Sequence, residues 1–536
     1  MIKIKDFIKK EDFIQAQIDS YNWLIYYGLQ EVIEEQRDFT IDVEDYNSSL
    51  GKVKIGKPVV VEAGQAPTPH YPFECRLRNL TYSAPIELEF IENGKSVPVE
   101  IGYIPVMVLS DLCLLKNKHS QLLSGDQLKK NMIKNHEDSE DMGGYFIING
   151  TERVLIVVED LAPNRIVTTF EGDASKPVPV AKVFSVRQGF RSRVIVEKRE
   201  SQSGETLFAS FPGISSRIPL TLLMRACGFN DAEIMDLFDD PLTRAEVSLN
   251  LDLNQITPQE AFKQLGKRAG VGHAKMYQSI RANQVLNNFL LPHLGNDDEY
   301  RVLKAEYLAI MAKKVIELAF GMREADDKDH YSNKRLRLAG DLLQELFRVS
   351  FNTLVKDIKY QIEKQNSRRR EINIKTAVRS GALSERIEYA MATGNWTGGR
   401  AGVSQVLDRT NYLSSISHMR RVSSLLSRSH PHFEARDLHS TQWGRICPNE
   451  TPEGQNCGLV KNLAVGTRVS QDRDDSVVEE YLKEFGMESF ISIRDRDQTL
   501  DESGSLDAFS EDSDEKLVLG EQDFEVVYEA IKNKEI

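Results

Sequence analysis

Apolar residues recur every three or four positions near the start of the chain, which predicts amphipathic helices between residues 7 and 35. Short β-branched or alternating segments follow, separated by Gly, Pro and Asn, and they predict strands at 57–63, 85–92 and 101–115. Within 143–161, two apolar runs flank Asn149-Gly150, a pair that suits a tight turn. The pattern therefore predicts helices followed by strands and a β-hairpin.

The pattern changes further along the chain. Residues 166–320 have the pattern of strands and then of helices, which predicts a separate α+β domain inserted into the first one. Strong helical periodicity returns over 334–366. Beyond residue 394 the chain becomes rich in Gly, Ser, Pro and Arg, and an acidic tail with strand-like segments follows. The predicted fold class is therefore α+β with several domains.

Length and charge refine this picture. With 536 residues, 40% of them apolar, the chain is long enough for about three or four domains with ordinary cores. The net charge is −13, but residues 471–536 hold 7 Lys and Arg against 21 Asp and Glu, which leaves +1 for the rest. Residues 394–470 hold 9 basic against 5 acidic residues, so this tract permits contact with phosphates.

The sequence predicts neither membrane association nor a zinc site. No window approaches the roughly 18 to 20 apolar residues that a membrane span needs, and the first residues lack the apolar core of a secretion signal. A soluble, cytoplasmic protein is therefore expected. The cysteines are sparse, and no two of them form a CxxC pair, so we expect reduced thiols and no zinc.

Three groups of polar residues resemble metal ligands but have simpler interpretations. The first group comprises Asp326, Asp327, Asp329, His330 and Asn333. It lacks the glycine and the final glutamate of a calcium-binding loop, so we favour helix capping by the acids, with basic residues turned to solvent or phosphate: Lys334, Arg335 and Arg337.

The second group, His430 and His432 beside Arg428, has too few ligands for zinc, and a loop that contacts a polyanion is favoured. In the third group, Asp495 and Asp497 would lie on one face of a strand, and an exposed acidic edge is favoured over metal binding.

Two polar stretches are hard to explain by packing alone. "GVSQVLDRTNYLSSISHMRRVSSL" contains Gln405, Asp408, Arg409, Asn411, His418, Arg420 and Arg421. "RDLHSTQWGRICPNETPEGQNCGLVKNLA" contains Arg436, His439, Arg445, Glu450, Glu453, Gln455, Asn456 and Lys461. Its "PNETPEG" segment holds two acids in a rigid loop, where they could act as general acid and base, as a metal clamp, or as a scaffold for other groups.

These two stretches also carry a resemblance to a known family. Together with "YPFECRLRNLTYSAPI", "GGYFIINGTERVLI", "KRLRLAGDLLQELFR" and "MATGNW", they extend from about residue 70 to 465. The sequence resembles the second-largest (β-type) subunit of multisubunit DNA-directed RNA polymerases in its archaeal and eukaryotic form. All the matching motifs belong to the amino-terminal half, so the chain looks like the N-terminal part of a split archaeal subunit.

The resemblance implies a domain layout for the α+β fold. A protrusion would comprise 1–165 and 320–390, and a lobe would be inserted at 166–319. A fork would follow at 391–466, and the acidic residues 467–536 would begin an external domain.

The resemblance also implies a function. The chain would form one wall of the active-centre cleft, contacting DNA, the RNA–DNA hybrid and the entering nucleotide during template-directed RNA synthesis by a two-metal mechanism. Alone it would be inactive, because Mg²⁺ would be held mainly by the largest subunit. Expected partners are the C-terminal half of the split subunit, the largest subunit, other polymerase subunits, the DNA template and the nascent RNA.

Matching positions imply roles for individual residues. Glu453, Gln405 and Asn456 would position groups near the RNA 3′ end and the entering nucleotide without taking part directly in the chemistry. Nucleic-acid contacts are expected from Arg420, Arg421, Arg428, His430, Arg436 and Arg445. For Arg420 and Arg421, structural ion pairs are an equal alternative. The rival interpretation is a protein that kept this fold but only binds nucleic acid or assists assembly.

Overall fold

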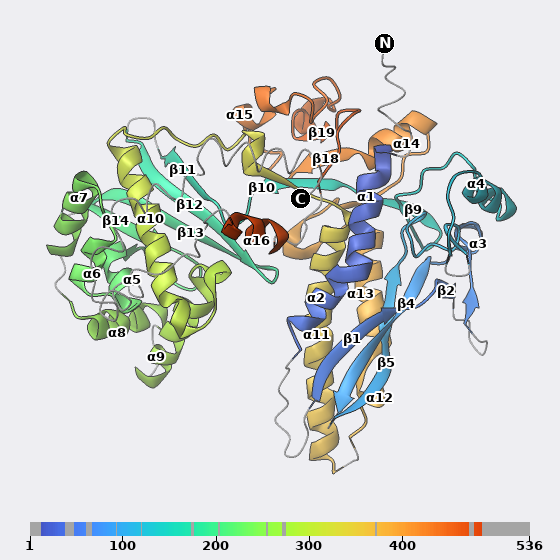
Figure 1. Ribbon diagram of the computed structural model, residues 1–536, viewed down its shortest axis with the longest axis horizontal. Coiled ribbons are helices and arrows are strands. Elements are labelled where there is room, and N and C mark those ends of the chain that lie inside the picture. Colours follow the sequence, from blue (N-terminus) through green and yellow to red (C-terminus); the bar gives the residue numbers. More distant parts are fainter. Residues whose placement is uncertain are drawn as a thin grey trace. The chain divides into compact units, whose positions relative to one another are not determined.

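A computed structural model of the chain describes residues 12–37, 48–60, 67–92, 94–118, 121–172, 176–201, 204–252, 256–270, 275–369, 372–470 and 476–484. Two compact units emerge, the first formed by 1–162 with 327–470 and the second by 163–326 with the C-terminal part (Figure 1). Residues 7–11 and 61–63 of predicted elements lie outside the described residues, as do Asp495 and Asp497.

The first unit contains most of the short strands. They are β1 (Ser48–Ile55), β2 (Val59–Val60), β3 (Thr68–Pro69), β4 (Ser83–Glu92), β5 (Lys95–Pro105), β6 (Asn117–Lys118), β7 (Gln121–Leu122), β8 (Phe146–Ile148), β9 (Thr151–Leu155), β10 (Val157–Leu161), β16 (Lys334–Arg337), β17 (Ser404–Val406), β18 (Arg421–Ser424) and β19 (Val460–Asn462). The larger sheets have the orders β1-β4-β5, β17-β9-β8 and β16-β10-β18-β19.

The helices of the first unit range from single turns to one of 29 residues. The α-helices are α1 (Asp12–Trp23), α2 (Leu29–Glu34), α3 (Pro72–Leu77), α4 (Gly125–Lys134), α11 (Ala339–Ser367), α12 (Ile374–Ala377), α13 (Ser380–Thr393), α14 (Tyr412–Met419) and α15 (Phe433–Arg436). A π-helical turn, Leu24–Gly28, joins α1 to α2, and 3-10 turns occur at Tyr331–Asn333, Thr397–Gly399, Ser440–Gln442 and Gly454–Asn456.

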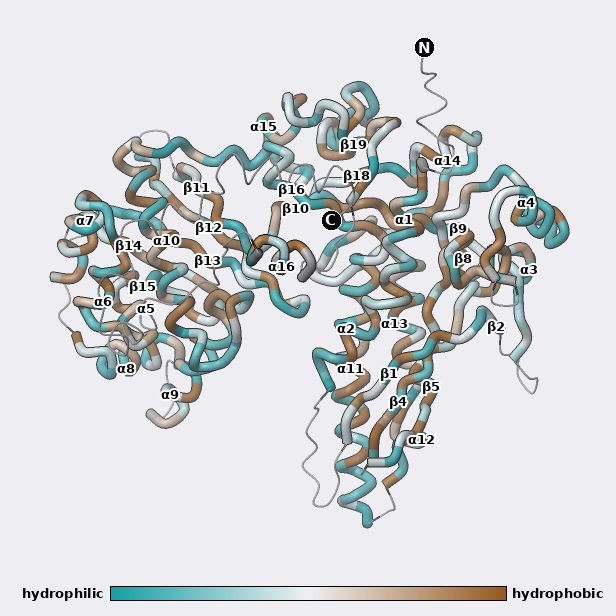
Figure 2. The backbone as a smooth tube through the Cα atoms, in the orientation of Figure 1, coloured by the Kyte–Doolittle hydropathy of each residue, from teal (hydrophilic) through white to brown (hydrophobic). Residues whose placement is uncertain are grey.

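The core of the first unit forms where α1, α11 and α13 pack beside the β1-β4-β5 sheet (Figure 1). Every second residue of β4 is buried from Ala84 to Phe90, and Figure 2 shows hydrophobic segments along β4 and β5. Side chains of α1 also satisfy the start of α11, because Gln17 accepts from the backbone N–H of Ala339 at 2.9 Å and Ser20 from that of Gly340 at 3.0 Å. The contact fixes α11 on α1.

The predicted hairpin is confirmed. β8 and β9 pair antiparallel with Ile148 opposite Thr151. Between them, Asn149 and Gly150 have φ angles of 49° and 75°. Positive φ at both central positions is what a type I′ turn requires.

Two predicted elements differ from the structure. Lys334–Arg337 is strand β16, not the start of the helix, because it pairs antiparallel with β10, and tertiary pairing overrides the helical periodicity. The strand predicted at 101–115 ends at Pro105. Residues beyond it are apolar because they line the core, as at Val106 and Met107, but they form turns, with Leu109 at a φ of 63°.

The second unit has the predicted strands followed by helices. Its antiparallel sheet has the order β11-β12-β13-β14-β15, with bounds Ile166–Glu171, Val178–Arg187, Phe190–Ser201, Gly204–Ser210 and Ile218–Pro219. Its helices are α5 (Leu220–Ala226), α6 (Asp231–Asp236), α7 (Pro241–Asp252), α8 (Pro258–Ala269), α9 (Lys275–Gln284), α10 (Arg301–Ala319) and α16 (Ser476–Glu484). Short turns lie at Val285–Phe289, Pro292–Leu294 and Asp298–Tyr300.

The helix α10 lies across β11, β12 and β13 and buries an almost continuous apolar face against them (Figure 1). The α+β fold class is confirmed, whereas the assignment of protrusion, lobe, fork and external domain stays a prediction. None of the described helices has a stretch that is both long and apolar enough to span a bilayer.

Candidate functional site

The two polar stretches meet on the β16-β10-β18-β19 sheet of the first unit. Strand β18, from the first stretch, runs parallel to β10 and antiparallel to β19, from the second stretch. Val422 on β18 is fully buried and lies opposite Val157 on one side and Lys461 on the other. Segments about 40 residues apart in sequence are therefore held side by side on one rigid base.

The acidic loop between Ile446 and β19 is held by hydrogen bonds between the Thr451 side chain and the loop backbone. The Thr451 hydroxyl donates to the carbonyl of Val460 and accepts from the N–H of Gly458, both at 2.9 Å. The two acids do different things: Glu450 accepts from the Ser417 hydroxyl, whereas Glu453 is exposed and its carboxylate contacts no hydrogen-bonding or charged group among the described residues. The acids are thus not a mutual pair.

No group of three or more His, Cys, Asp or Glu side chains in the described part of the chain is arranged to hold a metal ion. Of the three interpretations of the acidic loop, the scaffold that positions other groups fits this geometry.

Arg436, on α15, fastens the acidic loop to the segment before it. Its guanidinium donates to the carbonyls of Gln455 (2.9 Å) and Cys457 (2.6 Å) on one side. On the other it donates to the carbonyls of Pro431 (2.6 Å) and His430 (3.4 Å). Four backbone acceptors occupy the planar fork of donors, a geometry that suits arginine and not lysine. Its assignment as a nucleic-acid contact stays a prediction, and the structure shows it bracing two loops.

Gln405 is held by a buried histidine. The Nδ1 of His418 accepts from the backbone N–H of Asp408 at 3.1 Å, so the proton of the neutral ring lies on Nε2. That Nε2 is 3.0 Å from Oε1 of Gln405, and the Gln405 Nε2 donates to the Gly402 carbonyl at 3.0 Å. Burial lowers the pKa of His418 to about 4, and Arg421 acts in the same direction.

Two arginines of the first stretch are structural. Arg420 is buried and donates to the carbonyls of Phe13 (2.7 Å) and Ala464 (2.6 Å), and burial lowers its pKa. Arg409 forms ion pairs with Asp141 (3.0 Å) and Glu152 (2.6 Å). Arg420 therefore makes structural hydrogen bonds to backbone carbonyls, and its role as a nucleic-acid contact stays a prediction.

The remaining predicted contacts lie at the surface. Arg428 and His430 are exposed, Arg445 is exposed with one hydrogen bond to the Thr441 carbonyl at 2.8 Å, and Arg421 is half-buried on β18. Asn456 ends the 3-10 turn after Glu453, and its side-chain oxygen is buried without a hydrogen-bond partner. These residues therefore lie on β18 and in the loops next to β18 and β19.

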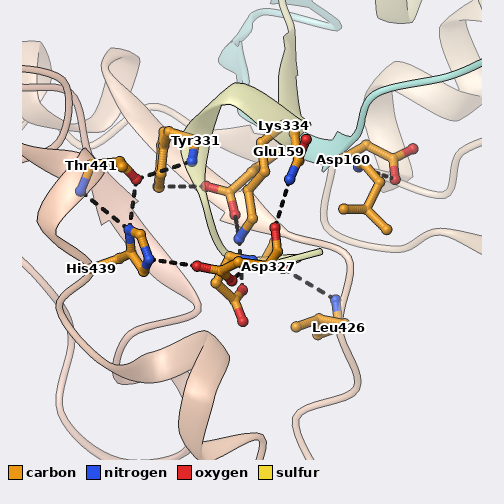
Figure 3. Close-up of polar contacts among 12 residues, drawn as sticks. Glu159, Asp160, Asp327, Tyr331, Lys334, Leu426, His439 and Thr441 are labelled. Atoms are coloured by element: carbon orange, nitrogen blue, oxygen red, sulfur yellow. Dashed lines mark hydrogen bonds and ion pairs between the residues drawn. The ribbon is translucent and has the colours of Figure 1, made fainter. Parts of the chain in front are cut away.

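A buried ion cluster joins strands β10, β16 and β19 of this sheet (Figure 3). Glu159 on β10 accepts from Nζ of Lys461 at 3.1 Å, from Nζ of Lys334 at 2.9 Å and from the Tyr331 hydroxyl at 2.8 Å. Burial alone would raise the pKa of Glu159, but the two lysines outweigh it and the pKa is lowered. Tyr331, with its hydroxyl against this carboxylate and buried, has a raised pKa.

The cluster continues to Asp327 (Figure 3). The Tyr331 backbone N–H donates to the Thr441 hydroxyl at 3.0 Å, which is 2.6 Å from Nδ1 of His439. The Nε2 of His439 is 2.7 Å from a carboxylate oxygen of Asp327. A continuous polar chain therefore ties the segment around His439 to β10 and β16.

These contacts correct the interpretation of the first acidic group. Lys334 and Arg337 do not face solvent or phosphate: Lys334 bonds Glu159 and Asp329, and Arg337 bonds Asp160 (3.1 Å) and Glu345 (3.2 Å). The strand β16 turns them inward. Sequence reasoning missed Glu159 altogether, since the only signal was a pair of neighbouring acids, Glu159 and Asp160, at the end of an apolar run.

Family models match most of the chain. One described as RNA polymerase beta subunit covers residues 12–385, and one described as RNA polymerase Rpb2, domain 3, covers 405–469. The second match contains Gln405, His418, Arg436, Glu453 and Asn456. These five residues therefore lie within a recognised domain of that family.

Individual relatives agree with these matches. DNA-directed RNA polymerase subunit Rpo2N of Methanocaldococcus jannaschii is 47% identical over 90% of this chain and 97% of that subunit. Rpo2N of Halobacterium salinarum is 44% identical over 91% and 96%. Rpo2 of Saccharolobus solfataricus is 43% identical over 90% of this chain but only 43% of that longer subunit.

The chain covers nearly all of each Rpo2N subunit but less than half of the longer Rpo2 subunit. This is the pattern expected when the chain corresponds to one part of a divided subunit. The rival of a repurposed binding protein has no support among these relatives. The chain belongs to the β-type subunit family of DNA-directed RNA polymerases, matches the N-terminal half of the split archaeal subunit, and acts as part of an RNA polymerase complex.

Proposed function

We propose that the fork surface forms one wall of the polymerase active centre and contacts DNA, the RNA–DNA hybrid and the entering nucleotide. The fork surface is defined by Gln405, Arg421, Arg428, His430, Arg445, Glu453 and Asn456. Arg420 and Arg436 belong to its support, because their guanidinium groups are occupied by backbone carbonyls.

One observation carries the proposal: Glu453 has an exposed, unpaired carboxylate, among the described residues, on a loop whose backbone is held from two sides. A carboxylate held in place before its partner arrives loses little freedom when it orients a basic group. Its task is therefore to position a basic group of a neighbouring subunit beside the RNA 3′ end and the nucleotide, as a charge-assisted contact.

The reaction of the complex is transfer of a nucleoside monophosphate to the RNA 3′ hydroxyl with release of pyrophosphate. Magnesium supplies charge stabilisation in such reactions. The described residues of this chain include no cluster suited to the ion, so we propose that the largest subunit holds it. No proton transfer is assigned to Glu453, and sequence choice comes from base pairing, with the protein holding backbones.

The finer partners and domain names belong to the same proposal. The C-terminal half of the split subunit and the largest subunit would cover parts of this chain, and DNA and nascent RNA would pass the fork surface. The protrusion (1–165 and 320–390), lobe (166–319), fork (391–466) and external start (467–536) are proposed as its domains, and the cytoplasm as its location.

The test is Glu453→Ala in a reconstituted polymerase, with single-nucleotide addition followed on a short RNA primer. We expect assembly to be retained and the addition rate to fall at least about 10-fold, the effect of losing one charge-assisted contact. The matched control is Glu434→Ala, which removes an exposed acid on α15, a short helix of the same fork segment. Equal rates for both variants would contradict the proposal.

A further inference from the structure

We infer that His418 is a positioning residue that turns the Gln405 amide so that an amide N–H, and not the amide oxygen, faces the nucleic acid. This inference rests on the proposed function, because it specifies how Gln405 meets the RNA strand. It starts from the two hydrogen bonds of the His418 ring, one to the Asp408 backbone and one to Gln405.

The direction of each bond follows from the donors. A backbone N–H can only donate, so the Nδ1 of His418 must accept from Asp408. The neutral ring then carries its proton on Nε2 and donates to Oε1 of Gln405. With its oxygen engaged by His418, Gln405 points its amide nitrogen the other way, where one N–H donates to the Gly402 carbonyl.

The ring itself cannot turn easily. His418 is 4% exposed on α14, and the Asp408 turn that it grips is held by the Ser415 hydroxyl, which donates to the Asp408 carbonyl at 2.6 Å. The Asp408 carboxylate accepts from the N–H of Thr410 at 2.9 Å. On the other side, Gln405 is anchored by pairing of β17 with β9, opposite Val154. Both ends of the contact therefore belong to rigid elements.

The charge state agrees with this geometry. Burial and Arg421 lower the pKa of His418 to about 4, while the Asp408 carboxylate opposes them. At neutral pH the ring is uncharged, so it fixes the amide by a single directed hydrogen bond and adds no positive charge to the surface.

The chemistry of the ligand follows. No described residue takes the second amide N–H of Gln405, which leaves one donor at a half-exposed position. A donor selects a hydrogen-bond acceptor, and the acceptors that an RNA strand in a hybrid presents at every nucleotide, whatever its base, are its phosphate and ribose oxygens. Gln405 would therefore donate a hydrogen bond to the RNA backbone whatever the base sequence.

Two substitutions at one position separate this role from a purely structural one. In His418→Gln, the side-chain nitrogen replaces Nε2 and keeps the donor to Gln405, but the acceptor for Asp408 is lost. In His418→Asn, the shorter amide replaces Nδ1, keeps the acceptor for Asp408 and loses the donor to Gln405. We expect His418→Asn to shorten the lifetime of a halted elongation complex in salt about 10-fold, as for one lost hydrogen bond to a charged group. His418→Gln should stay within about 3-fold of the parent, corresponding to a weaker indirect effect.

The same reconstituted polymerase with Gln405→Ala separates failure of this inference from failure of the proposed function. If His418 acts through Gln405, then His418→Asn adds nothing in the Gln405→Ala background. Additive losses, or a larger loss for His418→Gln than for His418→Asn, would overturn the positioning role while Gln405→Ala still shows the RNA contact. A complex unaffected by Gln405→Ala would remove the RNA contact itself, and this inference with it.

Discussion

The ammonium group of Lys461 lies 3.1 Å from both carboxylate oxygens of Glu159, and both side chains are almost completely buried. Lys461 is on β19, which follows the acidic loop, and Glu159 is on β10. The pair therefore fastens the strand that follows the acidic loop to an inner strand of the same sheet.

Glu159→Gln should loosen this sheet. The substitution leaves Lys461 and Lys334 buried together without their shared acid, and breaking a buried pair in this way costs about 3 to 5 kcal/mol. Lys461→Met should cost less, because Lys334 still neutralises Glu159. Hydrogen exchange of the β10, β18 and β19 amides measures the change. Glu140→Gln, in an exposed pair with Lys129, is the control and should cost under about 1 kcal/mol. Equal protection in all three variants would contradict the assignment.

Arg436→Lys should release the acidic loop. A lysine is a point charge and cannot reach the carbonyls of both Cys457 and Pro431 at once. We expect faster hydrogen exchange at 453–458 and nucleotide addition slowed about 10-fold, because a loosened loop misplaces Glu453. Arg445→Lys gives up a single carbonyl contact and serves as the comparison. If the two lysine variants behave alike, Arg436 does not brace the loop.

Alanine substitutions at two glycines of the same loop separate the cost of backbone strain from the cost of a steric clash. Gly454 and Gly458 have φ angles of 79° and 74°, so an alanine is strained at both. A Cβ at Gly458 would also lie 2.5 Å from the Arg436 carbonyl, whereas nothing lies within 4 Å at Gly454. Gly454→Ala should lower the free energy of local unfolding by about 1 kcal/mol, and Gly458→Ala should lower it clearly more. Hydrogen exchange of the loop amides measures both values. A larger cost at Gly454 would contradict the described packing.

Acid should destabilise the β17–α14 region through His418. In the unfolded chain His418 takes up a proton near its ordinary pKa of 6.5, but in the fold only near 4, facing Arg421 and Asp408. Between these values the unfolded state binds more protons, so the free energy of unfolding falls as pH falls, by about 1.4 kcal/mol per pH unit. Local hydrogen exchange between pH 7 and 5 measures this slope. His418→Gln should abolish it, and an unchanged slope would exclude His418 as its source.

The elements that sequence patterns predict well are those in which local and tertiary preferences agree. The hairpin at Asn149-Gly150 needs positive φ at two positions, and Asn and Gly supply it locally. The helix α10 spans 19 residues, and its neighbouring strands β12 and β13 span 10 and 12. By contrast, Lys334–Arg337 is a strand because it pairs with β10. The residues around it in the sequence give no sign of this pairing.

The residues proposed for the site stand out in the sequence, but their arrangement does not follow from it. Glu453, Gln405 and Asn456 stand out as polar groups in rigid, glycine- and proline-rich segments. The guanidinium groups of Arg436 and Arg420 donate to backbone carbonyls, and Glu159 pairs with two lysines. These contacts join segments that lie as much as 407 residues apart in the sequence. Such pairings are set by the tertiary fold.

The most direct test of the central claim is photo-crosslinking from position 453 in a halted elongation complex of the reconstituted polymerase. A photoreactive residue replaces Glu453 in one preparation and Glu434 in another, and crosslinked products are mapped on RNA, DNA and protein. The proposed wall predicts crosslinks from position 453 to the RNA 3′-terminal nucleotide or to a neighbouring basic segment of the largest subunit, and none of these from position 434. Crosslinks from 453 that avoid the RNA 3′ end and that subunit would contradict the account.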